Sequence, residues 1–106
     1  MEEHDEIISR IIGITNTTDP DPEIYLYGSR ARGDAKRNSD WDFLILLSNE
    51  NITFPIETDL MDKFYEVELE TGQVISPLIY SRKEWNEKHF FTPLSENIRK
   101  QGIRIR

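Results

Sequence analysis

The sequence contains no cysteine, and this absence removes several kinds of chemistry at once. A chain without cysteine has no disulfide framework, no thiolate zinc site and no cysteine nucleophile. Histidine is also scarce: His4 and His89 stand far apart in the chain. Ordinary surface or helix-end positions explain these two residues better than a metal site does.

Long hydrophobic runs and positive charge are missing as well. No stretch approaches the ~20 apolar residues of a membrane-spanning helix, and the acidic segment Met1 to Glu6 lacks the apolar region of a signal peptide. We therefore expect a cytoplasmic protein that makes no use of a membrane. The net charge of −7 argues against a general nucleic-acid-binding protein, which would carry a basic face over the whole domain.

The composition that remains is that of a globular domain. Of the 106 residues, 37% are hydrophobic and 31% are charged, which suits a folded chain with one modest core. No internal repeat, low-complexity segment or composition shift divides it. We expect a single domain over residues 1–106.

Hydrophobic periodicity predicts the order helix, strand, strand, helix, strand, helix, helix. The long helix, with Pro55 in its first turn, should face the core through Ile56, Leu60, Met61, Phe64 and either Val67 or Leu69. Pro77 places the third strand at an edge or a bulge, and the helical crossover before it predicts a mixed sheet. The expected ranges are a helix over 4–12 that Gly13 ends, a turn over 16–22, strands over 23–27, 41–47 and 73–80, a helix to about Glu70, short helices after Ser81 and Thr92, and a tail over 103–106.

The most informative stretch runs from Gly28 to Asp42, between the first two predicted strands. Asp40 and Asp42 are two residues apart at a strand start, so their side chains point to the same side. Two adjacent carboxylates repel each other unless something neutralises them. Mg²⁺ is the obvious candidate, because it binds one or two carboxylates and shares its other positions with substrate phosphates.

The residues before the aspartates suit a phosphate group. Gly28 permits a close backbone approach and a positive φ. Ser29 offers a hydroxyl and a backbone N–H where a short helix is predicted to begin, and helix N-termini bind phosphate. Four cations make this the most basic segment of an acidic chain: Arg30, Arg32, Lys36 and Arg37.

The arrangement of Gly28-Ser29, ten further residues and then Asp40-x-Asp42 resembles the Gly-Ser-x10-Asp-x-Asp signature of the minimal nucleotidyltransferases in the DNA polymerase beta superfamily. The run Gly-Ser-Arg-Ala-Arg-Gly-Asp over 28–34 and the pair Ser39-Asp40 strengthen the resemblance. The resemblance implies an α+β nucleotidyltransferase fold, in which helices pack on a mixed β-sheet and both aspartates lie on the second strand.

The resemblance also implies an activity: transfer of a nucleoside monophosphate, with AMP favoured, from an NTP such as ATP to a hydroxyl on a partner protein. Asp40 and Asp42 would be the catalytic residues and would hold Mg²⁺ or Mn²⁺. Stand-alone domains of this type are frequently paired with helical HEPN proteins, often ribonucleases, which implies an antitoxin-like role. The implied nucleotide-binding residues are Gly28, Ser29, Arg30 and Arg32.

One residue departs from the family pattern. Active members usually carry a third carboxylate on the strand after the long helix, and the register predicts Ser76 at that position. Serine is a poor metal ligand and a poor base at neutral pH. Glu68 or Glu70 could substitute, although a solvated helix end explains both. The alternative is a catalytically impaired nucleotide-binding or protein-binding module that neutralises a HEPN-type partner.

Simpler interpretations accompany several of these residues. Arg30 and Arg32 could equally point outward or pair with Asp34, and Lys36 and Arg37 are as well explained by a solvated loop. Trp41, between the two aspartates, should face the other side of the sheet and pack there. An exposed Phe90-Phe91 would indicate a partner surface, and with Trp41 it leaves a homodimer open.

Overall fold

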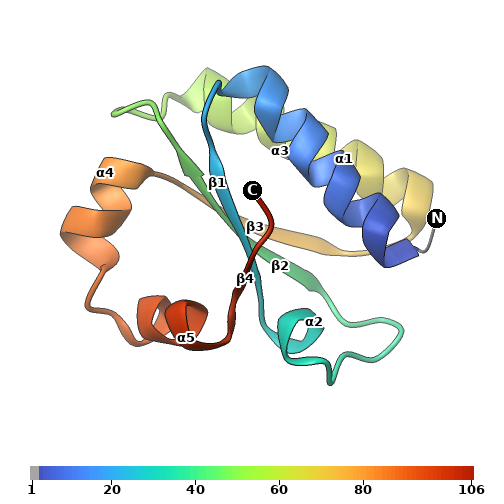
Figure 1. The fold of residues 1–106 in the computed structure, drawn as a ribbon. Coiled ribbons are helices and arrows are strands. Elements are labelled where there is room, and N and C mark those ends of the chain that lie inside the picture. The colour runs from blue at the N-terminus through green and yellow to red at the C-terminus, as the bar shows by residue number, and fades with distance from the viewer. Residues whose placement is uncertain (1–2) are drawn as a thin grey trace.

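The computed structural model describes residues 3–106, which form a four-stranded sheet with helices on both faces (Figure 1). The strand order is β3-β2-β1-β4; β1 runs antiparallel to β2 and β4, and β2 runs parallel to β3. The predicted α+β fold with a mixed sheet is confirmed. The elements are α1 (Glu3–Thr18), β1 (Glu23–Tyr27), α2 (Ser29–Arg32), β2 (Trp41–Leu47), α3 (Phe54–Thr71), β3 (Ile75–Ser81), α4 (Arg82–Glu84), the π-helical turn η1 (Trp85–His89), α5 (Pro93–Gln101) and β4 (Ile103–Arg104).

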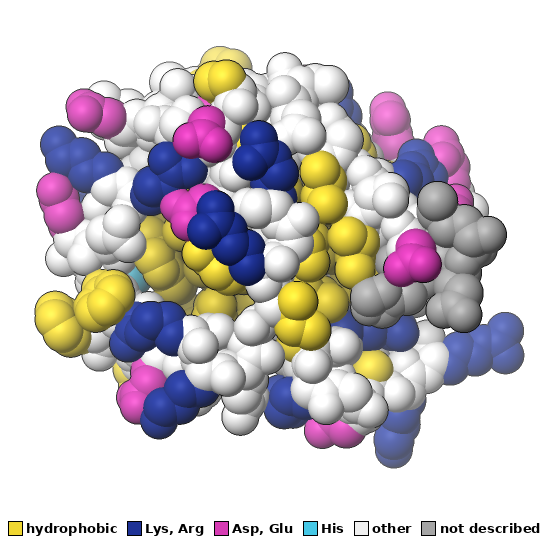
Figure 2. Space-filling model, viewed as in Figure 1, with side chains coloured by type: hydrophobic (Ala, Val, Ile, Leu, Met, Phe, Trp, Pro, Cys, Tyr) yellow, Lys and Arg dark blue, Asp and Glu magenta, His cyan; other side chains and the backbone are white. Residues whose placement is uncertain are grey.

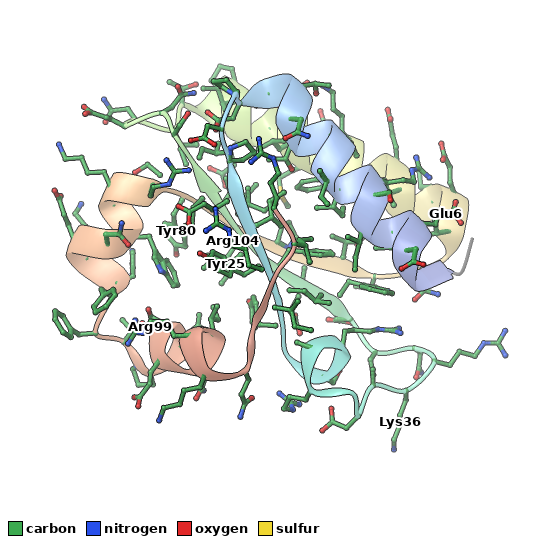
Figure 3. The ribbon with its side chains drawn as sticks, in the orientation of Figure 1. Glu6, Tyr25, Lys36, Tyr80, Arg99 and Arg104 are labelled. Atoms are coloured by element: carbon green, nitrogen blue, oxygen red, sulfur yellow. The ribbon has the colours of Figure 1, made fainter. Side chains whose placement is uncertain are left out.

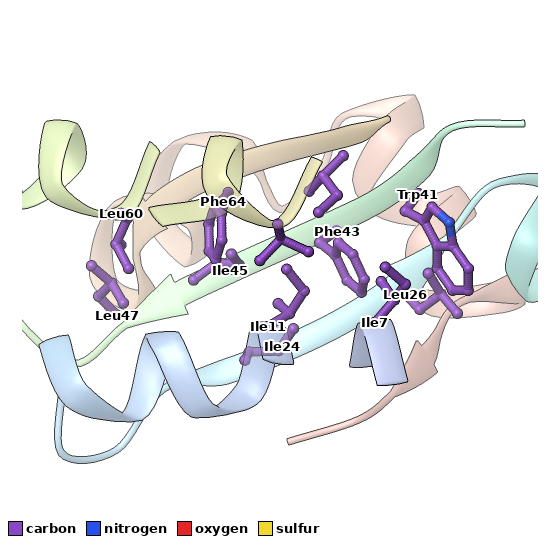
Figure 4. Close-up of a cluster of buried hydrophobic side chains, with 12 residues drawn as sticks. Ile7, Ile11, Ile24, Leu26, Trp41, Phe43, Ile45, Leu47, Leu60 and Phe64 are labelled. Carbon is purple, nitrogen blue, oxygen red and sulfur yellow. The ribbon is translucent and has the colours of Figure 1, made fainter. Parts of the chain in front are cut away.

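The helices α1 and α3 lie side by side on one face of the sheet and enclose the main core (Figure 1; Figure 4). β2 is buried over nearly its whole length because it is an internal strand between β1 and β3. Both faces of such a strand are covered, which is why its sequence is almost continuously apolar. The buried members of this core are Ile7, Ile11, Ile24, Leu26, Trp41, Phe43, Ile45, Leu47, Leu60, Phe64, Val67 and Ile75.

The predicted inner stripe of α3 is partly wrong. Leu60, Phe64 and Val67 are buried, whereas Met61 and Leu69 are 42% and 67% exposed. Val67 lies about two helical turns after Leu60 and returns to the same face, whereas Leu69 lies roughly half a turn away from it. Helical geometry therefore selects Val67 between the two alternatives.

The helix α1 continues past Gly13 to Thr18, so the predicted end at Gly13 and the turn from residue 16 are wrong. A glycine within a helix costs only about 1 kcal/mol, and packing beyond Gly13 offsets it. Ile14 contacts the core, and Thr15 is buried with its hydroxyl donating to the Ile11 carbonyl at 2.8 Å. The chain leaves the helix at Asp19 and Pro20 instead.

The second face of the sheet is only partly covered, by α4, η1 and α5 (Figure 1). Leu44, Leu46, Trp85 and Ile98 are buried there. Figure 2 shows a hollow with hydrophobic side chains at its bottom and lysines and arginines around it. β3 is an edge strand, as Pro77 predicted, although it begins at Ile75 rather than at residue 73.

Residues 103–106 do not form a free tail. Ile103–Arg104 pair with β1 as β4, the Ile105 N–H donates to the Ile24 carbonyl at 2.8 Å, and Ile105 packs against the main core. This segment pairs with the free edge of β1 because the edge of a strand carries N–H and C=O groups that can form hydrogen bonds. None of the described helices has the length and apolar character that crossing a bilayer requires.

Candidate active site

The turn after β1 lies directly against β2 at Asp42. Gly28 has a φ of 74°, a conformation that strongly favours glycine. A Cβ built on Gly28 would collide with Asp42 Oδ2 and would lie 3.3 Å from Asp42 Cγ. The turn therefore requires glycine for two reasons, backbone conformation and space. The Gly-Ser turn and Asp42 lie close together, as the sequence predicted.

Asp40, Asp42 and Ser76 gather on the partly covered face of the sheet. Asp42 is the cross-strand neighbour of Tyr27 on β1 and of Ser76 on β3, and directly opposite residues share a face. The Ser76 hydroxyl donates to Asp40 Oδ2 at 3.2 Å. Ser76 therefore lies beside both carboxylates.

The electrostatics of this cluster favour a cation. Burial and the neighbouring charge of Asp40 raise the pKa of Asp42, and Arg32 opposes the shift. Burial and the charge of Asp42 raise the pKa of Tyr27 to about 12, so Tyr27 keeps its proton at neutral pH. A divalent cation would relieve the repulsion between Asp40 and Asp42, and two carboxylates suit Mg²⁺ or Mn²⁺ as donors.

The two arginines of α2 have different surroundings. Arg32 is exposed and forms an ion pair with Asp34 at 3.3 Å, one of the two alternatives that the sequence left open. Arg30 instead lies over the Trp41 ring at 4.4 Å and donates to backbone carbonyls of the following loop. Trp41 is buried on the core side, away from the aspartates, as predicted.

The remaining residues that the sequence weighed for this site lie on α2 and on the loop before β2. Lys36 and Arg37 are exposed on the loop before β2, and Lys36 points away from the body of the protein (Figure 3). Ser29 begins α2, and its carbonyl accepts hydrogen bonds from the Gly33 and Asp34 N–H groups at 3.1 and 3.2 Å. These two bonds close the C-terminal end of α2.

The two glutamates that could replace the missing carboxylate are engaged in other contacts. Glu68 Oε1 accepts a hydrogen bond from the Ile75 N–H at 2.8 Å, and Glu70 pairs with Arg10 at 2.6 Å. Among the side chains that the structure describes, no three His, Cys, Asp or Glu residues form a group that could hold a metal ion. The residues present therefore offer a cation two carboxylates, from Asp40 and Asp42.

His89 is the last residue of η1, which agrees with the expected helix-end position, and its ring packs against other aromatic rings. Its ring lies 4.6 Å from that of Tyr80 and 5.4 Å from that of Trp85. In Figure 3, Tyr80 lies near Tyr25 and Arg104 on the partly covered face of the sheet. The side chain of His4 lies outside the described residues.

Sequence reasoning missed Gln73 altogether. Gln73 Oε1 accepts hydrogen bonds from both Arg30 Nη2 and Trp41 Nε1, at 3.2 and 3.1 Å. Its only sequence signal is its place after Gly72, between the long helix and the third strand. That place does not reveal which side chain it contacts.

Comparisons with known proteins agree with this geometry. The family model described as a nucleotidyltransferase domain matches residues 8–105. Among solved structures, the chain is similar to a toxin-antitoxin with AMP-PNP, with 20% identity, a TM-score of 0.67 and coverage of 93% of this chain and 72% of that chain. It is also similar to a toxin-antitoxin MntA-HpeT mutant in which two aspartates are replaced by glutamate, with 18% identity, a TM-score of 0.65 and the same coverage of both chains. At these identities the likeness concerns the fold, and a search of curated proteins finds no match.

Proposed function

The chain belongs to the nucleotidyltransferase domain family, and from this premise we propose that it transfers a nucleoside monophosphate from an NTP to a hydroxyl on a partner protein. AMP and ATP are the favoured group and donor, because the similar toxin-antitoxin was solved with AMP-PNP. The reaction would take place in the cytoplasm, on a single domain spanning residues 1–106. The observation that carries the proposal is the contact of Gly28 with Asp42, which joins the Gly-Ser turn to the paired carboxylates.

Each residue of the site has a distinct proposed role. Asp40 and Asp42 would hold Mg²⁺ or Mn²⁺, and a bound cation would polarise phosphate oxygens and stabilise the charge that develops during transfer. Ser29 would contact the β- and γ-phosphates with its hydroxyl and N–H. Arg32 would exchange its ion pair with Asp34 for one with phosphate, which an exposed pair permits because it is worth little.

The reaction balances without a further reactant. The oxygen of the acceptor hydroxyl forms a bond to the α-phosphorus, and the bond from that phosphorus to the bridging oxygen of the β-phosphate breaks. Pyrophosphate leaves with the electron pair, and the hydroxyl proton passes to water. Gly28 leaves space beside Asp42 because it has no side chain.

Ser76 favours a second candidate function. A serine that donates to Asp40 contributes no negative charge, so a second cation next to the acceptor would bind weakly. The alternative is an antitoxin-like module that binds nucleotide, turns over slowly or not at all, and neutralises a helical HEPN-type partner. Both similar solved structures are toxin-antitoxin proteins, which supports a toxin partner for either candidate.

The experiment uses the purified chain, its co-purified helical partner, Mg²⁺ and ATP labelled at the α-phosphate. The transferase proposal expects label on the partner and none with the Asp40→Asn/Asp42→Asn variant. Equal labelling by the variant, or no labelling by the wild type, would reject it. Nucleotide binding without labelling would instead support the second candidate.

A further inference from the structure

We propose that Arg30 is a positioning residue that fixes Asp40 through the backbone before it, rather than a ligand of the triphosphate. The inference rests on the proposed function, because it takes Asp40 as a metal ligand. It assigns different tasks to two arginines that are only two positions apart in α2.

The first observation is the contact of Arg30 with the loop. Arg30 Nη2 donates to the carbonyls of Ser39 and Arg37, at 3.0 and 3.3 Å. Ser39 directly precedes Asp40, so the guanidinium binds the backbone next to the carboxylate. Arginine suits this task because its planar guanidinium can stack on Trp41 while Nη2 donates to the loop.

The segment that Arg30 contacts, residues 36–39, forms a closed turn. The Lys36 N–H donates to Ser39 Oγ at 2.8 Å, and the Ser39 N–H donates to the Lys36 carbonyl at 3.0 Å. Residues 36–39 are thereby linked to one another, and Arg30 joins this turn to α2. Arg30 thus adds a side-chain link between the Gly-Ser turn and the residue before Asp40.

The second observation is the anchor on the far side of Arg30. Its guanidinium carbon lies 4.4 Å from the centre of the Trp41 ring, and Gln73 Oε1 accepts from both Arg30 Nη2 and Trp41 Nε1. Trp41 is buried in the main core. The contact therefore ties the loop to the first residue of β2 and to the link between α3 and β3.

The third observation is that Nη2 and one face of the Arg30 guanidinium are already engaged in this arrangement. Its Nε is buried and has no hydrogen-bond partner among the described residues, while Nη2 is shared among three acceptors. Moving the guanidinium to a phosphate would break all three bonds and the stacking on Trp41. Arg32 is exposed, and its charge already acts on Asp42.

The two roles predict different responses to Arg30→Lys. Lysine keeps the positive charge but loses the planar guanidinium that stacks on Trp41. If Arg30 positions Asp40, binding of Mn²⁺ alone, measured by electron paramagnetic resonance without nucleotide, should weaken by about 10-fold, as for other residues that orient a metal ligand. If Arg30 only binds phosphate, the affinity for Mn²⁺ alone should stay at the wild-type value.

Two variants of Gln73 test the positioning role without changing Arg30 itself. Gln73→Ala removes the shared acceptor and should weaken Mn²⁺ binding by a similar factor, about 10-fold. Gln73→Glu keeps an acceptor oxygen and should retain most of the affinity. Arg37→Ala is the charge control, because it removes a cation from the same loop but leaves the carbonyl that Arg30 contacts.

Amide hydrogen exchange of residues 36–41 gives a second readout, and circular dichroism checks folding. Faster exchange confined to this segment, with weaker Mn²⁺ binding in Arg30→Lys and Gln73→Ala, supports the positioning role. Wild-type Mn²⁺ affinity in both variants overturns it and leaves the proposed function standing, whereas a wild type that binds neither Mn²⁺ nor AMP-PNP overturns both. If Arg30→Lys fails to fold, the comparison of Mn²⁺ binding by Gln73→Ala and Gln73→Glu tests the proposal.

Discussion

The carboxylate of Asp42 is half-buried beside that of Asp40, and both conditions raise its pKa. The ionised form is thus less stable in the folded protein than in the unfolded chain. Because binding a cation requires that ionised form, the residue that suits the proposed chemistry also lowers the stability of the metal-free protein.

Replacing Asp42 should therefore stabilise the protein when metal is absent. At neutral pH we expect a higher melting temperature for Asp42→Asn than for the wild type. The destabilising effect of the carboxylate is present above its raised pKa and is lost as the pH falls through that pKa. The difference between the two proteins should shrink as a thermal-melt series approaches the ordinary aspartate pKa of 3.8.

Bound ligand should make the wild type more stable than Asp42→Asn. With Mn²⁺ and AMP-PNP at about 100 times the dissociation constant, the wild type should gain about 2.7 kcal/mol and Asp42→Asn should gain little. A variant that is less stable than the wild type without metal would contradict the account of Asp42. Asp59→Asn serves as the control, because it also removes one carboxylate but lies at an exposed ion pair with Lys63 on α3.

Ser76 permits the opposite substitution. Ser76→Asp would place a third carboxylate opposite Asp42, so we expect roughly tenfold tighter Mn²⁺ binding, because affinity rises with the number of charged ligands. The metal-free variant should melt at a lower temperature, since three like charges then meet. Mn²⁺ titration followed by electron paramagnetic resonance checks the first effect. An unchanged affinity would show that position 76 cannot reach the ion.

At the scale of elements, the sequence predicted the bounds of those helices and strands whose ends depend on neighbouring residues in the chain. The predicted bounds of β1 and β2 match the structure, because turn residues and polar residues delimit two clearly apolar runs. The end of α1 was missed because packing of Ile14 and Thr15 outweighs the effect of Gly13. β4 was missed because a two-residue strand has no periodicity of its own and forms only through pairing with β1.

Two glycines test this interpretation by opposite responses to alanine. Gly13→Ala should stabilise the protein by about 0.5–1 kcal/mol, because the position lies within a helix and an added Cβ meets no atom within 4 Å. Gly28→Ala should cost about 1–3 kcal/mol, because its positive φ and the collision with Asp42 both oppose a side chain. Urea denaturation measures both. Loss of stability in Gly13→Ala would mean that α1 ends near Gly13 after all.

At the scale of the whole molecule, the sheet separates stability from the proposed chemistry. α1 and α3 bury the main core on one face, while Asp42 and Ser76 lie on the other face, which α4, η1 and α5 cover in part (Figure 1). The close approach of Gly28 to Asp42 could be predicted from the sequence because both residues lie within one short segment. It could not predict the contact of Arg30 with Gln73, which depends on where α3 returns to the sheet.

The C-terminal segment connects several of these parts. Ile105 packs on the main core, its N–H donates to Ile24, and Arg106 Nε donates to Asn16 Oδ1 at 2.9 Å. Truncation after Gly102 should cost about 3 kcal/mol in urea denaturation, from lost apolar burial and lost backbone hydrogen bonds. The variant Arg104→Ala/Arg106→Ala, which keeps the backbone, should cost less than about 1 kcal/mol. Truncation without a measurable cost would contradict the structural role of β4.

The most direct test of the central claim is a Mn²⁺ titration of the wild type and of Asp40→Asn/Asp42→Asn, with and without AMP-PNP, followed by electron paramagnetic resonance. We expect the wild type to bind Mn²⁺ and AMP-PNP together, each tightening the binding of the other, and the double variant to lose this coupling. Nucleotide-dependent Mn²⁺ binding that is absent from the wild type, or equally strong in the variant, would contradict a catalytic cation held by Asp40 and Asp42.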